Sequence, residues 1–347
     1  MKKKRTIIFW VVSLTLVIGC VWFIKDFKEV TEAFKNVHIN ADKANREDPI
    51  IFEVYHKNAF IKSFKTKEDA INYANKYKDV YVKQKNTDEW IWNSFDPYIL
   101  FENDKYINDY DSFSDAVFFA KEKEGRKIFY LSNQNVIWSD SENIKEKVLL
   151  DVPVILQKPE LPRGCEVTSL AMLLNYAGIK VDKMELAKKI DKDTTPLSKK
   201  GNRTYYGNPN DGFVGDMYSL KNPGYGVYNG PIERLMKEYM PDQTVNLTGC
   251  EFEDLFHFLS KGQPVWAITN TTYKKLDDSQ FEIWLTPTGP VEITYKLHAV
   301  LITGYDEKYV YFNDPFYSKK NIRAKKEDFK AAWNQMGRQA ISYVSSN

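Results

Sequence analysis

Cys165 occupies a position where a thiol can become a nucleophile, at the predicted start of a helix. Pro162, Arg163 and Gly164 precede it as a turn, and apolar residues at helical spacing follow it as far as a stop at Gly178. The N-terminus of a helix directs backbone N–H groups toward the sulfur and favours the thiolate. We therefore expect a depressed pKa for Cys165 and covalent chemistry at its sulfur.

A thiol nucleophile needs a base, and the chain has four histidines. His298 stands at the head of a strongly apolar segment within a predicted strand, 291–305, from which an imidazole can project beyond a sheet edge. His257 lies among aromatic residues on a predicted helix, where a packed or surface histidine is the better interpretation. His38 falls in a polar stalk and His56 in a turn. His298 is therefore the candidate general base.

Two further residues complete the set. Asp314 ends the next predicted strand, 309–313, sixteen residues after His298. A hairpin of these strands would bring the acid beside the imidazole, where it can fix the tautomer and orientation of the ring. Gln157, eight residues before Cys165, is the candidate side-chain donor to an oxyanion.

Cys250 lies in a second Gly-Cys-Glu tripeptide but is the weaker candidate. It precedes a helix that Thr248 and Glu251 can cap, and no Gln or Pro leads into it. A Cys165–Cys250 disulfide is the structural alternative to a free nucleophile. The candidate ligands show neither C-x-x-C nor H-x-x-x-H spacing, so we expect no metal and no cofactor.

Composition limits the class of protein. The chain has 347 residues, 43% of them hydrophobic, which predicts a folded protein of about two units rather than a disordered one. The 49 Lys plus Arg nearly balance the 47 Asp plus Glu, for a net charge of +2. Such a chain has no large basic field for a phosphate backbone, and we expect no nucleic acid partner.

Residues 1–24 predict a cytoplasmic tip and a membrane anchor. Residues 2–5 are all basic, and residues 6–24 carry no charge. As a helix rising about 1.5 Å per residue, this run nearly matches a bilayer core of about 30 Å. The positive-inside rule places the basic end in the cytoplasm and the polar stalk, 25–50, with everything after it outside. The alternatives are a cleaved signal or one lipidated at Cys20.

An internal repeat follows the stalk and occupies residues 51–140. Its copies, 51–94 and 97–140, match at an offset of 46 residues. Each reads as two alternating strands, a helix and two more strands, and Thr66 or Ser112 is the plausible N-cap of the helix. No Cys or His recurs at matching places in the two copies. We therefore interpret the repeat as a ββαββ spacer or as a module that recognises a cell-envelope component.

The region 150–345 is long enough for a core of its own. Besides the helix at Cys165, we expect helices at 183–190, 231–239 and 252–261, and strands at 264–269, 291–305 and 309–313. Residues 201–230 are rich in Gly, Asn, Pro and Tyr and lack periodicity, which is typical of a functional loop. Its tyrosines either line a cleft or belong to a purely structural Ω-loop: Tyr205, Tyr206, Tyr218, Tyr225 and Tyr228.

The order Gln157, Cys165 at a helix start, His298 on a strand and Asp314 after the next strand resembles the papain-like cysteine peptidases. More narrowly, several segments of residues 150–345 together resemble the peptidase C39-like proteins of Gram-positive bacteria. These segments are Val-Pro-Val-Ile-Leu-Gln157, Leu-Pro-Arg-Gly-Cys165-Glu-Val-Thr-Ser-Leu, Gly-Phe-Val-Gly (212–215), Gly-Tyr-Gly-Val-Tyr (224–228), Gly-Gln-Pro-Val (262–265), His298-Ala-Val-Leu-Ile-Thr-Gly-Tyr and Asn-Asp314-Pro.

The resemblance implies an α+β, papain-like fold for residues 150–345, preceded by the duplicated region and one transmembrane helix. It also implies the roles of nucleophile for Cys165, general base for His298, orienting acid for Asp314 and oxyanion donor for Gln157.

We expect from this a membrane-anchored, outward-facing thiol hydrolase that cleaves a peptide or amide bond. Acyl transfer to an amine uses the same residues and stays open. The alternative is a catalytically inactive C39-like scaffold that binds the cell envelope. The expected partners are a peptide or protein substrate, such as a cell-envelope component, and the membrane through residues 6–24. The expected location is the cell membrane, spanned once with the N-terminus in the cytoplasm.

Overall fold

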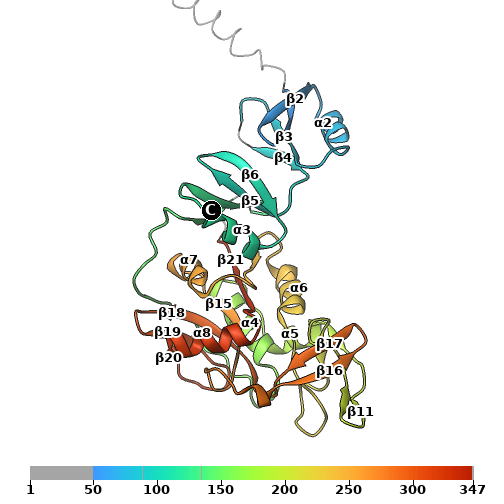
Figure 1. The fold of residues 1–347 in the computed structure, drawn as a ribbon, viewed down its shortest axis with the longest axis vertical. Helices are drawn as coiled ribbons and strands as arrows, with labels where there is room; N and C mark the ends of the chain where they lie inside the picture. Colours follow the sequence, from blue (N-terminus) through green and yellow to red (C-terminus); the bar gives the residue numbers. More distant parts are fainter. Residues whose placement is uncertain (1–49, 88, 134, 346–347) are drawn as a thin grey trace, which may run out of the picture. The chain divides into compact units, whose positions relative to one another are not determined.

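The computed structural model describes residues 50–87, 89–133 and 135–345 (Figure 1). No helix within these ranges is long and apolar enough to cross a bilayer. The predicted anchor, 6–24, lies outside the described residues, as does the predicted stalk up to residue 49. The chain divides into two compact units, 1–94 and 95–347, which we describe separately.

The described part of the first unit is a four-stranded antiparallel sheet with one helix. Its elements are β1 (Phe52–His56), β2 (Ala59–Phe64), α2 (Lys67–Ala74), β3 (Val80–Gln84) and β4 (Trp90–Asn93). The strand order is β2-β1-β3-β4. Thr66 is the N-cap of α2, as its sequence position predicted, and its hydroxyl accepts the Asp69 N–H at 3.1 Å. The small core consists of Val54, Ala70, Ala74, Val80 and Val82.

The second copy of the repeat, which opens the second unit, has the same ββαββ order. Its elements are β5 (Tyr98–Glu102), β6 (Lys105–Tyr110), α3 (Phe113–Ala120), β7 (Arg126–Tyr130) and β8 (Asn135–Ser139). The register shift between Val54 and Tyr55 of β1 recurs between Leu100 and Phe101 of β5. Residues 46 positions apart are therefore structurally equivalent in the two copies, including those at the register shift.

The second copy shares a hydrophobic core with the region that follows it. Phe113 of α3 packs edge-to-face on Phe258 of α7 (Leu255–Ser260), with ring centroids 5.7 Å apart. The Tyr130 hydroxyl donates to the Thr244 carbonyl at 2.8 Å. The sequence grouped both copies as one region, 51–140, whereas the structure divides the chain between them. The physical reason is that apolar side chains of the second copy complete a larger core.

The rest of the second unit is an α+β domain around a mainly antiparallel sheet of order β14-β21-β15-β18-β19-β20, with β9 paired to β18 (Figure 1). Its strands are β9 (Val148–Leu149), β14 (Thr244–Asn246), β15 (Val265–Asn270), β18 (Leu297–Tyr305), β19 (Tyr309–Asn313), β20 (Ile322–Lys325) and β21 (Ala340–Tyr343). Its principal helices are α4 (Cys165–Tyr176), α5 (Lys183–Lys189), α6 (Asn229–Tyr239), α7 and α8 (Lys326–Gln335).

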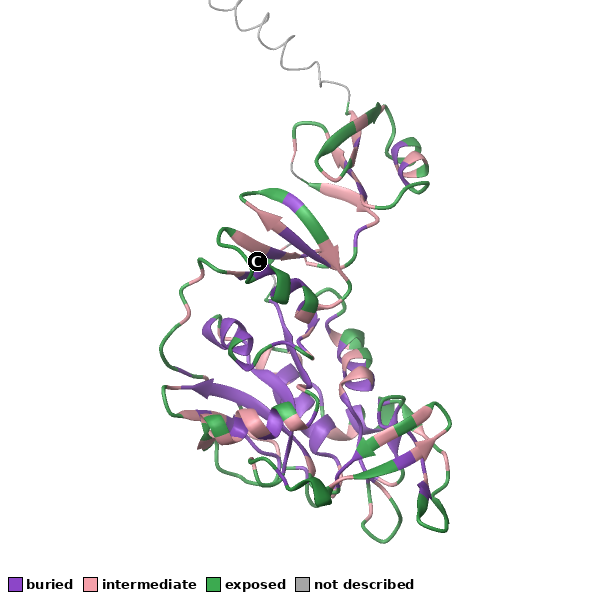
Figure 2. Ribbon diagram, viewed as in Figure 1, coloured by how far each residue is buried: buried purple, intermediate pink, exposed green. Residues whose placement is uncertain are grey.

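Strands β15 and β18 are buried almost throughout, because both faces of the sheet are covered (Figure 2). Alternate side chains of a strand point to opposite faces. One face contributes to the core that contains α4, through Trp266, Ile268, Ala299 and Leu301. The other contributes to the core that contains α7 and α8, through Val265, Ala267, Val300 and Ile302. Helix α4 therefore packs against the face of the sheet that carries Ala299 and Leu301, and the Ser169 hydroxyl donates to the Ala299 carbonyl at 3.2 Å.

A second small sheet lies beside this domain core. It has the order β11-β12-β16-β17 and comprises β11 (Ser198–Lys200), β12 (Arg203–Tyr205), β16 (Glu282–Thr286) and β17 (Gly289–Ile293). The sequence predicted one strand over 291–305, and this prediction was wrong in its length. A turn separates β17 from β18, because the Thr294 carbonyl accepts the Leu297 N–H at 3.0 Å.

Candidate active site

Cys165 is the first residue of α4, as its sequence context predicted, and Gly164 is the N-cap. Gly164 N–H donates to the Leu161 carbonyl at 3.0 Å, which closes the turn before the helix. A Cβ on Gly164 would lie only 2.6 Å from Leu161 Cβ, so the tight approach requires glycine. The Cys165 side chain is nearly buried, and one edge of it lines a pocket.

His298 and Asp314 lie together at the open end of the β18–β19 hairpin. Leu301 pairs with Asn313 in this hairpin, which places Asp314 directly after the paired part of β19. His298 Nε2 is 2.9 Å from Asp314 Oδ1, and both side chains are buried. A carboxylate only accepts hydrogen bonds, so Nε2 carries the proton and Nδ1 presents its lone pair.

Three further contacts fix this pair. The Phe316 ring stacks on the His298 ring with centroids 4.5 Å apart and planes 8° apart. The Phe316 N–H donates to Asp314 Oδ1 at 2.7 Å, and the Tyr273 hydroxyl donates to Asp314 Oδ2. Burial by itself would raise the pKa of Asp314, but the hydrogen bonds and charge of its partners outweigh it and lower the pKa. Asp314 is therefore a carboxylate at neutral pH.

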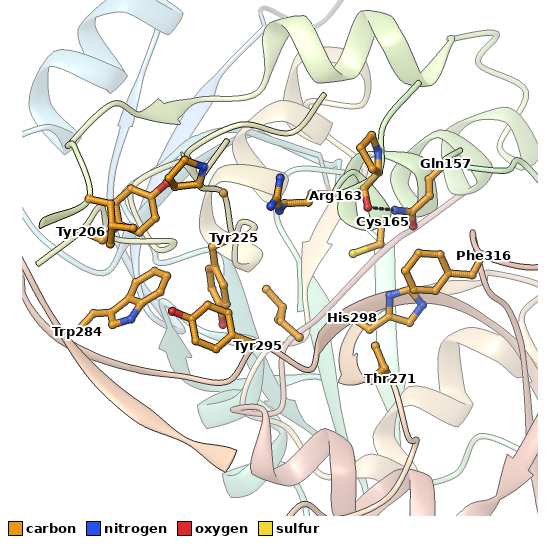
Figure 3. A pocket seen from close by; sticks show the side chains of 15 residues that line it. Gln157, Arg163, Cys165, Tyr206, Tyr225, Thr271, Trp284, Tyr295, His298 and Phe316 are labelled. Carbon is orange, nitrogen blue, oxygen red and sulfur yellow. Dashed lines mark hydrogen bonds between the residues drawn. The ribbon is translucent and has the colours of Figure 1, made fainter. Parts of the chain in front are cut away.

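The free ring nitrogen of His298 is available for a proton. Nδ1 is buried and has no hydrogen-bond partner among the residues described. Cys165 and His298 both line the same pocket (Figure 3). An unoccupied nitrogen whose ring is held by a carboxylate is the arrangement that a general base needs.

The Cys165 thiol has a second neighbour, the buried carboxyl of Glu166. The thiol donates to Glu166 Oε2 over 3.2 Å, and the Val227 N–H donates to Oε1 over 3.0 Å. Burial raises the pKa of Glu166 to about 7. Burial and the Glu166 charge raise the pKa of Cys165 well above its ordinary value, although the Ala299 backbone N–H opposes this. The structure thus differs from the expected depressed pKa, since in this arrangement burial outweighs the helix N-terminus.

Gln157 is fully buried beside the cysteine. Its Nε2 donates to the Leu161 carbonyl at 3.1 Å and to the Pro162 carbonyl at 3.0 Å, while Oε1 has no partner among the described residues. Its backbone N–H donates to the Pro315 carbonyl at 3.0 Å, which ties the segment before Cys165 to the segment after Asp314. Gln157 Nε2 is therefore engaged by two backbone carbonyls and does not point a free hydrogen into the pocket.

The pocket that contains these residues has a volume of about 460 Å³. Figure 3 shows Gln157, Cys165, His298 and Phe316 at one end, and a group of aromatic side chains at the other. The remaining lining residues are Pro162, Arg163, Leu197, Tyr206, Pro223, Gly224, Tyr225, Thr271, Trp284, Tyr295 and Leu297. None of the lining residues is a carboxylate. Of the five tyrosines proposed from sequence as a cleft wall, Tyr206 and Tyr225 line the pocket.

The other candidate residues lie elsewhere. Cys165 and Cys250 are both free, so the disulfide alternative is not what the structure has. His257 Nδ1 is 3.1 Å from Glu142 Oε2, and its ring lies against Trp138, as a packed histidine does. Within the described ranges, no group of three His, Cys, Asp or Glu side chains is arranged to hold a metal ion.

Sequence reasoning named Tyr206 and Tyr225 at the aromatic end of the pocket but missed Trp284 and Tyr295 there, and it also missed Glu166, Tyr273 and Phe316. Glu166 gave no clear signal, because an acid in the first turn of a helix is common and is usually exposed, whereas this one is buried with the rest of the first turns of α4. Tyr273 and Trp284 gave no signal, because their segments reach the site only through the folding of distant strands.

Comparisons with known proteins identify a matching family and similar chains. The sequence model of the Peptidase_C39 like family matches residues 149–341. The uncharacterized protein YvpB of Bacillus subtilis (strain 168) is 43% identical over 242 residues, covering 66% of this chain and 93% of that protein. A crystal structure from Bacillus anthracis, named as a C39-like peptidase, is 50% identical with a TM-score of 0.55. That match covers 58% of this chain and 98% of the other.

Proposed function

Because the chain belongs to the peptidase C39-like family, we propose that it is a thiol hydrolase that cleaves a peptide or amide bond with Cys165 as the nucleophile. The observation that carries the proposal is the His298–Asp314 pair at 2.9 Å, buried in the pocket that Cys165 lines. This pair gives an imidazole of defined tautomer with Nδ1 free to take the thiol proton.

The proposed reaction has two halves. Cys165 gives its proton to His298 Nδ1, and the thiolate attacks the substrate carbonyl to form a tetrahedral oxyanion. The imidazolium then returns the proton to the departing amine, which leaves a thioester on Cys165. His298 next takes a proton from water, and hydroxide attack on the thioester releases the acid and restores the thiol. An amine in place of that water would give acyl transfer, so the same residues serve both outcomes.

Asp314 and the first turn of α4 support the charges of this reaction. Because the pKa of Asp314 is lowered, the acid stays ionised and stabilises the imidazolium without taking its proton. Backbone N–H groups at a helix start have no partner inside the helix and can hold an oxyanion. Gln157 is the proposed side-chain donor, and its Nε2 must leave the Leu161 and Pro162 carbonyls to act.

The pocket also supports a proposal on the substrate. Three of its aromatic side chains, Tyr206, Tyr225 and Trp284, are buried, and the rings of both tyrosines lie within 5.1 Å of the Trp284 ring. Arg163 is the one Lys or Arg among the described residues that line the pocket, and its guanidinium already donates to the backbone carbonyls of Asp216, at 3.1 Å, and Ser219. A preformed aromatic wall without carboxylates favours an aromatic or large apolar side chain beside the scissile bond.

A second candidate function is a binding protein with an inert thiol. The observation in its favour is the raised pKa of Cys165, whose thiol donates to Glu166 instead of being ionised. This reading predicts that Cys165 is alkylated no faster than an ordinary thiol, whose half-point lies near pH 8.5.

We further propose that residues 6–24 anchor the chain in the cell membrane with the N-terminus in the cytoplasm. The support is the sequence pattern: basic residues at 2–5 followed by an uncharged apolar run. Protease added to intact cells should degrade the region after residue 24 if the proposal holds. Protection of that region until the cells are lysed would contradict it.

Peptide profiling tests the proposed function directly. Cells that carry the intact chain are compared with cells that carry the Cys165→Ala chain, and peptides released from envelope and secreted proteins are identified by mass spectrometry. We expect peptides found only with the intact chain, with aromatic or large apolar residues next to the cleavage site. Identical profiles would contradict proteolysis of native substrates.

A further inference from the structure

Glu166 is a buried carboxyl that contacts the nucleophilic sulfur and has no part in the reaction proposed above. Its side chain is 1% exposed. Oε2 accepts the Cys165 thiol, and Oε1 accepts the Val227 N–H. In the part of the chain that the structure describes, the groups that act on its carboxyl are backbone N–H groups and the Cys165 thiol, and no Lys or Arg is among them. A buried carboxylate without a cation is costly, so its place beside the sulfur calls for an explanation.

Several elements hold this carboxyl in position. Its own backbone carbonyl accepts the Trp266 indole N–H at 3.0 Å, which fixes the first turn of α4 against β15. Gly226 passes directly over it, and a Cβ at Gly226 would collide with Oε1. The loop 224–228 is therefore shaped to admit this side chain and to give it one hydrogen bond. The surrounding backbone therefore leaves space for the carboxyl at this position and fixes its orientation.

We propose that Glu166 is a positioning residue that controls the ionisation of Cys165: the neutral carboxyl supports the thiolate, and the carboxylate holds the thiol protonated and away from His298. This inference rests on the proposed thiol hydrolase activity and adds a residue to it. In the ionised state the carboxylate accepts the thiol hydrogen bond at Oε2, across the 3.2 Å contact between sulfur and oxygen. In the neutral state the carboxyl O–H donates to the sulfur, while the thiol proton passes to His298 Nδ1.

The groups that face Glu166 leave it free to titrate near neutral pH. Burial raises the pKa of Tyr225 and raises that of Tyr228 to about 12, so both phenols remain neutral. Asp314, which acts on the sulfur from the other side, remains charged because its pKa is lowered. These two phenols and Asp314 therefore keep one charge state while Glu166 changes its own. Burial raises the pKa of Glu166 to about 7, which places the change within the physiological range.

The test is the rate of alkylation of Cys165 by iodoacetamide in the full chain, from about pH 5 to about pH 9, spanning ordinary carboxyl and thiol pKa values. Mass spectrometry of the Cys165 peptide distinguishes this residue from Cys20 and Cys250. The variants are Glu166→Gln, which imitates the neutral carboxyl, and Glu166→Met, which keeps the bulk but lacks donor and acceptor. Glu251→Gln is the matched control, because Glu251 follows the other cysteine and its side chain is 62% exposed.

We expect Glu166→Gln to move the half-point of alkylation down by about one pH unit, which is about a tenfold gain in rate near pH 8. Cys165 should be alkylated more slowly in Glu166→Met than in Glu166→Gln, because methionine cannot donate a hydrogen bond to the thiolate. Glu251→Gln should match the unsubstituted chain. The unsubstituted chain should itself show a shoulder near pH 7 where Glu166 ionises, which keeps the test decisive if a variant fails to fold.

Two outcomes would overturn the inference, and they are distinguishable from failure of the proposed function. Equal profiles for Glu166→Gln and Glu166→Met would reduce Glu166 to a packing role. The pH profile of Glu166→Gln could also match that of the unsubstituted chain while His298→Ala still slows alkylation. That result would refute the role of Glu166 and leave the proposed thiol hydrolase standing. An ordinary half-point near pH 8.5 that His298→Ala does not change would overturn the proposed function itself.

Discussion

The tripeptide Gly-Cys-Glu occurs twice in the second unit, at 164–166 and at 249–251, and the two copies have different surroundings. Both cysteines are buried and free, and burial raises the pKa of each. The first lines a pocket with His298, and the carboxyl of its glutamate is buried against the sulfur. The glutamate of the second is largely exposed, and the Cys250 thiol donates to a backbone carbonyl at 3.3 Å.

The difference arises from the elements that face each tripeptide. Cys165 faces the open end of the β18–β19 hairpin, which supplies a histidine and an acid from more than a hundred residues later. Cys250 faces α3 of the second repeat copy, whose Lys121 pairs with Asp254 at 2.7 Å. The same local sequence therefore yields a candidate nucleophile in one place and a packed core residue in the other. The surrounding tertiary structure decides which.

The strongest prediction separates the two cysteines by removing each sulfur. We expect Cys165→Ala to abolish cleavage of a peptide library by the purified full chain, because the covalent step is lost. Cys250→Ala should leave the cleavage rate within about twofold per folded molecule, since its sulfur contacts only structural groups. Cleavage products are counted by mass spectrometry. An equal loss of cleavage in Cys165→Ala and Cys250→Ala would mean that the two cysteines contribute to stability and that neither is the nucleophile.

The next largest effect concerns His298, the proposed general base. His298→Ala should reduce the rate of cleavage by about 10²–10⁴-fold, the usual contribution of a general base. His257→Ala is the control, because that ring packs against Trp138 and its Nδ1 lies 3.1 Å from Glu142 Oε2. It should lower the thermal midpoint and leave the rate per folded molecule unchanged. A similar rate loss in the two variants would sink the assignment of His298 as base.

A third prediction concerns stability and pH. The folded-state pKa of Glu166 is raised to about 7, so the folded chain retains a proton that the unfolded chain releases above its ordinary pKa. This lowers stability as pH rises through the interval between those values. Glu166→Gln should therefore stabilise the chain by about 3 kcal/mol near pH 8 and not near pH 4. Urea unfolding at both pH values measures this. Glu251→Gln weakens a helix cap and should show no gain in stability near pH 8.

The smallest effect tests the surroundings of Cys250. Lys121→Ala removes the cation that faces the buried Asp254, whose pKa burial raises and Lys121 lowers. Because the lysine is partly exposed, we expect a loss of about 1–2 kcal/mol in the free energy of unfolding. The alkylation rate of Cys165 should not change. A change in that rate would mean that the repeat copy and the pocket are coupled.

The sequence predicted the candidate catalytic residues better than it predicted the residues that contact them. Helical spacing after Gly164 located Cys165, and two apolar strands in succession brought His298 and Asp314 together, because both depend on local pattern and a short turn. The long strand predicted through residue 305 was wrong because the turn after β17 has no strong turn residue. Glu166 is buried by loop 224–228 and Tyr273 reaches Asp314 from beyond β15, so neither contact follows from periodicity.

The repeat shows the same limit at a larger scale. No local pattern separates the copies, since each has a helix N-cap, Thr66 or Ser112, and each has the same irregularity in its first strand. What separates them is tertiary: Phe113 and its neighbours belong to the core of the second unit, while the described part of the first unit has a small core of its own. Hydrophobicity alone does not say which neighbour a side chain will bury against.

Covalent capture of the nucleophile tests the central claim most directly. The full chain is treated at neutral pH with a peptide chloromethyl ketone that ends in phenylalanine, and the modified cysteine is identified by mass spectrometry. The account predicts rapid modification of Cys165, loss of that modification in His298→Ala, and no modification of Cys250 in the folded chain. Slow, equal modification of Cys165 and Cys250, independent of His298, would contradict it.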